Sequence, residues 1–192
     1  MQVGSNDGLQ GDPIAALIRQ NSAWRVLFIE PLPHIFRRLI TNYPQLPNYS
    51  FENVAISLER GKRRMYYVSD EIKRVRQNVP YFYDQIGSFD FNHVLKHGFG
   101  PFITSEEVRC EPLADTLARN GITRIDLIHI DTEGFDFEII KQLDLTEQAP
   151  RAILYEHTHL SELDKVTAKR LLRHAGYHIQ RVSDDDTLAL YR

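Results

Sequence analysis

The segment that decides the fold is residues 125–136, which read IDLIHIDTEGFD. Its first half is an apolar, β-branched run of the kind that forms a buried strand. The run ends in Asp131, Glu133 and Asp136, and helical periodicity follows at 137–143. A strand that passes through a short polar turn into a helix is the repeating unit of α/β proteins. We therefore predict a strand that ends at Asp131 and a helix soon after it.

The same alternation of apolar runs and helical periodicity extends along the chain. Further strands are predicted at 25–29, 51–56, 152–156, 178–182 and 187–191, and further helices at 14–18, 35–40, 113–118 and 161–175. A run at 64–68 either pairs with 51–56 or forms a hairpin. Only a short acidic turn separates the last two strands, so they must be antiparallel. The expected fold class is α/β, with a mostly parallel sheet and a C-terminal antiparallel hairpin.

Length and composition fit one domain over residues 1–192. Segment 70–108 breaks the regular pattern because it is rich in aromatic residues and glycine. It is either a lid over a pocket or a loop that packs a small core of its own. The first strand, at Gln2 and Val3, is short for the centre of a sheet. We expect this strand to be truncated and residues upstream of it to be missing.

Charge and cysteine content limit the partners. A formal net charge of -3 gives no electrostatic reason to bind nucleic acid or an anionic membrane. No apolar run approaches the length of a membrane span. Cys110 is the only cysteine, which excludes an internal disulfide and a zinc cluster of thiolates. We therefore expect a cytoplasmic protein with a small-molecule partner.

The first candidate site follows the first strand and comprises Gly4, Ser5, Asn6, Asp7 and Gly8. Glycine permits positive φ and close backbone approach, and amide groups in such a loop can face a carboxylate or a phosphate. The alternative is a tight turn that binds nothing. The spacing lacks the three glycines of dinucleotide-binding loops, which counts against NAD.

Two further candidate sites follow the next strands. Glu30 comes directly before Pro31 at the end of an apolar run, where a carboxylate can accept hydrogen bonds from both hydroxyls of an adenosine ribose. After the third predicted strand begins, Asn53, Val54 and Ala55 offer a polar side chain and amides to an adenine edge. The alternatives are a solvated acid beside a proline turn and ordinary strand-capping residues.

Acids gather after the strand at 125–131. Because ligands of open α/β sheets bind outside the carboxyl ends of strands, Asp131 and Glu133 are placed to face one. Their mutual repulsion calls for a cation, a proton or a hydrogen-bonded ligand nearby. Asp136 is equally explained as a first-turn helix acid. His157, after the next strand, is a candidate general base, although loop histidines are more often surface groups.

Together these segments resemble the FkbM-type family of S-adenosylmethionine-dependent methyltransferases. The pieces that carry the resemblance lie in the family's order and are Gln2–Gly8, Asp12-Pro13, Ile29-Glu30-Pro31, Asn53–Ser57 and Ile130–Asp136. The predicted order of strands and helices fits the family over nearly the whole chain. Two positions depart from its pattern, since Gln2 stands where many members have an acid and His129 where lysine is common.

The resemblance implies a Rossmann-like class I fold and S-adenosylmethionine as the methyl donor. It implies transfer to an oxygen of a hydroxylated small molecule or a sugar. The donor's amino-acid end would lie near Gly4–Gly8, its ribose on Glu30 and its adenine near Asn53–Ala55. Asp131 and Glu133 would lie beside donor and acceptor.

Methyl transfer to a hydroxyl needs alignment, exclusion of water and a base. Asp131 is the first candidate for that base, followed by His157 or Glu133.

Two other functions stay open at this stage. One is a module that binds S-adenosylmethionine without turnover. The other is a metal-dependent enzyme with Asp131, Glu133, Glu156, His157 and His159 as ligands. No compact motif such as H-E-x-x-H supports that second function, so no metal site is predicted. The acceptor and the oligomeric state are not readable from the sequence.

Overall fold

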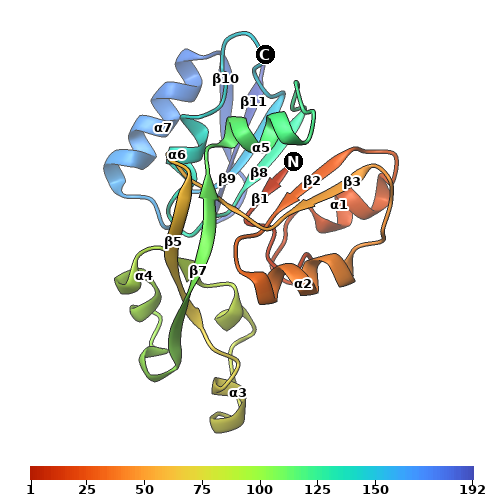
Figure 1. Cartoon of the computed structure of the whole chain (residues 1–192). Coiled ribbons are helices and arrows are strands. Elements are labelled where there is room, and N and C mark those ends of the chain that lie inside the picture. Colours follow the sequence, from red (N-terminus) through yellow and green to blue (C-terminus); the bar gives the residue numbers. More distant parts are fainter.

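The computed structural model describes all residues from 1 to 192. Its central sheet has seven strands in the order β10-β11-β9-β8-β1-β2-β3 (Figure 1). Their bounds are β1 Gln2–Val3, β2 Val26–Ile29, β3 Tyr49–Glu52, β8 Leu127–Ile130, β9 Ala152–Glu156, β10 Tyr177–Arg181 and β11 Asp186–Tyr191. Only β11 runs against its neighbours, β9 and β10, and all other pairs are parallel. The α/β class, the mostly parallel sheet and the closing antiparallel hairpin are therefore confirmed.

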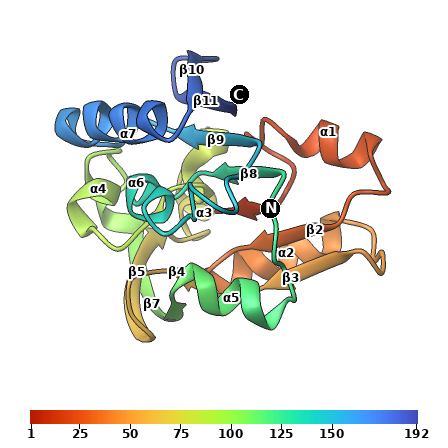
Figure 2. The ribbon, with the colours of Figure 1, turned by 90° about the horizontal axis from the view of Figure 1, so that it is seen from above.

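Helices cover both faces of this sheet because alternate side chains of each strand point to opposite sides. Leu27 and Ile29 belong to the core beneath three helices, α5 (Leu113–Arg119), α6 (Asp136–Ile140) and α7 (Glu162–His174). Val26 and Phe28 pack on the other face against α1 (Ala15–Gln20) and α2 (Pro33–Asn42). Figure 2 shows α6 and α7 on one side of the strands and α1 on the other.

One predicted strand, at 51–56, is divided. β3 ends at Glu52, and β4 (Ala55–Ile56) belongs to a second sheet of order β4-β7-β5-β6. The division falls at Asn53, whose side-chain amide donates to the carbonyl oxygens of Glu30 at 2.8 Å and Pro31 at 2.9 Å. These bonds give the carbonyl groups after β2 a hydrogen-bond partner at the point where the chain leaves the central sheet after β3.

The second sheet projects away from the first as a long ribbon (Figure 1). Its main strands, β5 (Gly61–Val68) and β7 (Ile103–Glu111), are antiparallel along their length, and β6 (Gly87–Ser88) pairs with β5. The run predicted at 64–68 thus pairs with β6 and β7, not with β3. β7 begins inside the segment 70–108 that we expected to be irregular. We call residues 61–111 the accessory lobe.

Short helices fill the rest of the accessory lobe. They are α3 (Ile72–Val75), α4 (Phe91–Leu95) and the 3₁₀ helices η1 (Tyr81–Asp84) and η2 (Gly100–Phe102). Their buried side chains form a separate small core of Val68, Ile72, Tyr83, Ile86, Val94 and Phe99. Of the two alternatives left open for this segment, a lid and a loop with a small core of its own, the structure shows that the small core is present. No helix of the protein combines the length and the apolar character needed to cross a membrane.

Candidate functional site

A cleft opens where the strand order of the central sheet reverses. The chain runs from β1 outward through β2 and β3, then returns to the other side of β1 with β8 and β9. The loops that follow β1 and β8 diverge at this point, and ligands of open α/β sheets bind there. Two adjoining cavities, of about 260 and 230 Å³, occupy the carboxyl ends of these strands. Six residues line both cavities: Gly4, Asn6, Glu30, Gln85, Asp131 and Glu133.

The two cavities differ in chemistry. The first, which we call the apolar cavity, is lined by Val3, Ile29, Leu32, Val54, Ala55, Ile56, Met65, Phe89 and Phe135 among others. The second, the acidic cavity, is lined by seven carboxylates: Asp12, Glu30, Asp131, Glu133, Glu156, Asp185 and Asp186. Neither lysine nor arginine lines the acidic cavity. The cleft therefore suits a ligand with an apolar part and a cationic part.

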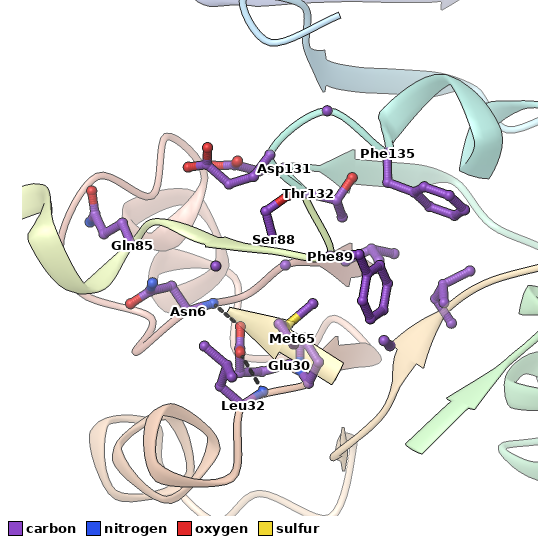
Figure 3. A pocket seen from close by; sticks show the side chains of 18 of the residues that line it. Asn6, Glu30, Leu32, Met65, Gln85, Ser88, Phe89, Asp131, Thr132 and Phe135 are labelled. Atoms are coloured by element: carbon purple, nitrogen blue, oxygen red, sulfur yellow. Dashed lines mark hydrogen bonds between the residues drawn. The ribbon is translucent and has the colours of Figure 1, made fainter. Parts of the chain in front are cut away.

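Glu30 stands between the two cavities, directly after β2. Its carboxylate accepts from the backbone amides of Asn6 at 3.0 Å and Leu32 at 2.9 Å, as Figure 3 shows. Burial raises its pKa to about 7, because the two amide bonds only partly offset desolvation. Each carboxylate oxygen retains a lone pair for a further donor. Pro31 follows and lines the apolar cavity.

The loop Gly4–Gly8 approaches the cleft but does not offer it free amides. Gly4 and Ser5 both donate to the carbonyl of Ile29, and Gly8 donates to that of Ser5. The Asn6 amide binds Glu30, and that of Asp7 binds the Asn6 side chain at 2.6 Å. The expectation that these amides face a ligand is wrong in this structure, because internal acceptors take all five.

Gly4 has a different role, which is steric. Its φ is +78°, and a Cβ there would lie 1.7 Å from the carbonyl oxygen of Asp131. Glycine is thus required where the loop after β1 crosses the end of β8. Asp7 and Gly8 line neither cavity, and Ser5 lines only the acidic one.

The third predicted segment contributes in part. Val54 and Ala55 line the apolar cavity, whereas Asn53 does not and instead holds the Glu30–Pro31 turn as described above. The polar side chain that we expected at an adenine edge is therefore used within the protein.

Asp131 and Glu133 meet the cleft from the loop between β8 and α6. Burial raises the pKa of Asp131 well above its ordinary value, and the nearby carboxylates of Asp136 and Glu133 raise it further. Asp136 accepts from the amides of Thr132 and Gly134, both at 3.3 Å, and so fixes this loop. The loop holds Glu133 in the left-handed region, at φ +55°. Asn6, at φ +46°, is the only other residue besides glycine that has a positive φ. Strained backbone of this kind gathers at functional sites.

Several buried polar atoms around the acidic cavity have no partner. They are Gln2 Oε1, Asp12 Oδ2, His129 Nε2 and Glu156 Oε2. Gln2 Oε1 and Asp12 Oδ2 are acceptor oxygens, and Glu156 Oε2 becomes one when the side chain ionises; burial together with neighbouring acids raises the pKa of Glu156 to about 10, and a cation nearby would favour the ionised form. Unpaired buried acceptors are costly, so the cavity is suited to a ligand that brings donors and positive charge.

The two departures from the family pattern turn out to be one contact. The Gln2 amide nitrogen lies 3.2 Å from Nδ1 of His129, and both side chains are almost fully buried. Glutamine and histidine thus contact each other between β1 and β8, at the two positions where the resemblance led us to expect an acid and a lysine.

His157 is not at the cleft, which corrects the prediction that it is a candidate base. Its Nδ1 lies 3.1 Å from the hydroxyl of Thr187, beneath β11, and the residue lines neither cavity. The cause is the direction of the chain at the end of β9. Glu156 and His159 line the cavities, whereas His157 and Thr158, which lie between them in sequence, point away from the cleft. Among the histidines of this loop, the less favoured His159 is the one that lines the apolar cavity.

The sequence leaves a lid at 70–108 as one alternative, but it identifies none of the accessory-lobe residues that line the apolar cavity. Met65, Gln85, Ser88, Phe89 and His93 line it from this side (Figure 3 labels all but His93). No strand-end motif marks these residues. The only available signal was the i, i+4 spacing of His93 and His97, which places two histidines on one helical face.

Comparison with known proteins gives one finding. The sequence model described as the methyltransferase FkbM domain matches residues 2–179 of the chain. Comparison with curated proteins gave no match, and neither did comparison with solved structures.

Proposed function

Because the chain belongs to the FkbM methyltransferase family, we propose that it transfers a methyl group from S-adenosylmethionine to an oxygen of a hydroxylated small molecule or a sugar. The observation that carries this proposal is the pairing of an apolar cavity with an acidic one that has no lysine or arginine. S-adenosylmethionine has an aromatic base at one end and, at the other, positive charges on sulfur and nitrogen that outweigh its single carboxylate.

The residues present fit this donor in stated positions. Val54 and Ala55 would pack against the adenine, and Glu30 would accept from the ribose hydroxyls. The cationic end would lie among the unpaired acceptors of the acidic cavity, beside Asp131 and Glu156. A dinucleotide fits less well, because its pyrophosphate would bring negative charge to a wall of carboxylates.

The strand order supports a Rossmann-like class I methyltransferase fold. Numbered by their order within the central sheet, the strands read 3-2-1-4-5-7-6, which is the Rossmann order with one antiparallel strand, β11, inserted next to the last. We further propose that residues 1–192 act as one domain and that the accessory lobe closes the acceptor side of the cleft.

S-adenosylmethionine supplies an electrophilic methyl group on a sulfur that leaves uncharged. This chain must therefore orient the acceptor, exclude water and remove the hydroxyl proton. Asp131 is the first candidate for that base, since it lies where the two cavities meet; Glu133 is the second. A cation bound beside Asp131 would lower its raised pKa and keep it ionised. We expect Asp131→Asn to bind the donor but to lose turnover.

A small-molecule acceptor, no nucleic-acid or membrane partner, and a cytoplasmic location remain predictions of the charge and cysteine content. They are not needed for the test of the donor.

The test is titration calorimetry of S-adenosylmethionine, and separately of its demethylated product, against the purified protein. We expect wild type to bind both, and Glu30→Ala to weaken binding at least about 100-fold, since two hydrogen bonds to a charged acceptor are lost. Glu30→Gln keeps one acceptor oxygen for the turn, so weaker donor binding by this variant too would not be explained by misfolding of the turn. His157→Ala is the matched control: it is equally buried, lies close in sequence to the cleft residues, and should leave donor affinity unchanged. Absence of binding by folded wild type, or displacement of the donor by NAD, would contradict the proposal.

A further inference from the structure

Three histidines meet one carboxylate at the edge of the apolar cavity. His93 lies on α4 and His97 follows its end, His159 lies in the loop after β9, and Glu133 lies in the loop after β8. The ring centroids of His93 and His159 are 4.6 Å apart, and His97 lies 5.4 Å from the first and 5.9 Å from the second. Segments distant in sequence thus bring four side chains to one point.

Their ligand atoms have the spacing of a metal site. One nitrogen or oxygen from each of the four residues lies within 4.8 Å of all the others. Glu133 Oε2 is 3.3 Å from His159 Nε2 and 2.5 Å from His93 Nε2. A tetrahedral ion with bonds of about 2.1 Å separates its ligands by about 3.4 Å, so the first distance already fits and the second must open by about 0.9 Å.

His97 has a nitrogen that the protein does not use. Its Nε2 is buried and has no hydrogen-bond partner, although it sits beside two other imidazoles. A buried ring nitrogen without a partner is costly, and nothing on the accessory lobe accounts for it. A fourth ligand position on an ion would satisfy it.

The carboxylate is held in place by its own loop. Asp136 binds the amides on both sides of Glu133, and the left-handed backbone at Glu133 aims its side chain at the histidines. Gly134 allows the loop to lie against His159, because a Cβ there would come within 3.2 Å of the His159 carbonyl oxygen. The geometry is therefore preset, which favours binding of an ion over a chance surface cluster.

Lys96 shows how the cluster is balanced without an ion. Its ammonium lies 3.1 Å from Nδ1 of His93 and 3.3 Å from Nδ1 of His159. An ammonium only donates, so both rings carry their proton on Nε2; His93 donates this proton to Glu133, and His159 Nε2 lies 3.3 Å from the same carboxylate oxygen. Binding of a cation at Nε2 would move each proton to Nδ1 and displace Lys96, whose side chain is exposed and free to rotate.

We propose that His93, His97, His159 and Glu133 form a binding site for one divalent transition-metal ion of the zinc class. Three imidazoles and one carboxylate suit Zn²⁺ or Co²⁺ better than Mg²⁺, which prefers oxygen ligands. This site lies at the wall that the acceptor would face, and it leaves Asp131 as the candidate base. It does not rest on the proposed function, because metal binding is measured without methyl transfer.

The experiment is calorimetric titration of the chelator-treated full chain with Zn²⁺, together with absorption spectra of the Co²⁺ form. We expect one ion per chain and the d–d bands of a tetrahedral Co²⁺ site. His97→Ala and His159→Ala should each weaken Zn²⁺ binding more than about tenfold, the loss that even outer-shell changes cause. His34→Ala is the matched control. His34 Nδ1 also pairs with a glutamate, Glu106, at 3.2 Å, but His34 is not one of the residues that could hold a metal ion.

Lys96→Met is the sharper variant, since removal of the competing donor should make Zn²⁺ binding at least as tight as in wild type. Thermal unfolding of each variant without metal separates loss of a ligand from loss of the fold. No stoichiometric binding by wild type would overturn the proposal. Equal affinities for wild type and His97→Ala, or weaker binding by Lys96→Met, would overturn it as well.

Discussion

The central sheet provides one wall of the cleft and rests on a core of 20 buried residues, whereas the accessory lobe opposite packs around a core of only six. A second cluster of six attaches the base of β5 and β7 to α2 through Leu32 and Ile35. The larger core can hold strained backbone and buried acids in place against their cost in free energy, and the smaller core can do so less well. The two walls should therefore differ in how much strained backbone and buried charge they can hold, and in how readily they unfold locally.

The site itself shows this difference. Asn6 and Glu133, the two left-handed residues other than glycine, both lie on the central wall, as do the buried acids with raised pKa values. The accessory wall contributes the buried side chains of Met65, Ser88 and His93, but it holds no left-handed residue other than glycine. Strain and buried charge persist only where the surrounding structure fixes them. The central wall of the cleft is thus preset, and the accessory wall is the more adaptable one.

The largest expected effect tests whether the central wall is as rigid as this comparison requires. Gly4→Ala would place a Cβ 1.7 Å from the Asp131 carbonyl at φ +78°. The backbone cannot move there without separating β1 from β8. We therefore expect the free energy of unfolding to fall by about 4 kcal/mol, or the chain not to fold, as measured by chemical unfolding.

The control for Gly4 comes from the accessory wall. Gly100→Ala would meet only the Leu95 side chain, at 3.4 Å, without a left-handed φ. It should change the free energy of unfolding by less than about 1 kcal/mol. Similar losses for the two variants would refute the idea that the walls differ in rigidity.

A second prediction separates the stabilities of the two cores. Ile72 in the accessory lobe and Ile128 in β8 are both fully buried, so each change to alanine should cost about 2–5 kcal/mol locally. We expect Ile72→Ala to speed amide hydrogen exchange only within residues 61–111, and Ile128→Ala to speed it throughout the chain. If Ile72→Ala speeds exchange in β2 and β8 as much, the lobe does not open independently.

The third expected effect concerns the buried acids and, unlike the other two, depends on pH. Because the folded pKa of Glu156 is raised to about 10, the protonated side chain contributes stability that is complete below about pH 4.5 and is lost as pH rises toward 10. Glu156→Gln lacks this loss. We therefore expect the Tm of the variant minus that of wild type to grow steadily between pH 5 and pH 9, since each pH unit in this window removes up to about 1.4 kcal/mol from wild type alone.

Glu107→Gln is the comparison for Glu156, because Glu107 is an exposed acid on β7 that pairs with Lys62 at 3.0 Å. Its Tm difference should not change with pH over this range. Saturating S-adenosylmethionine should also reduce the effect at Glu156, since a cation in the acidic cavity favours the ionised form. A pH dependence that is the same at both positions would show that the two walls do not differ in stored charge.

The sequence by itself determined the order of strands and helices in and around the central sheet, but not in the accessory lobe, because hydrophobic periodicity is a local property of each segment and is weak at 70–108. It also placed Glu30, Asp131 and Glu133 correctly at the ends of parallel strands, where all α/β sheets collect their polar side chains. The family followed from five short segments in order, and the match over residues 2–179 confirms it.

Tertiary structure alone decided which neighbouring side chains face the cleft. It turned His157 under β11 while His159 reached the cavity, and it used the amides of Gly4–Gly8 internally. It also brought His93 within 2.5 Å of Glu133, 40 positions away. The physical reason is that side-chain direction beyond a strand end, and contact across separate sheets, depend on how the cores pack. No periodicity within one segment records that packing.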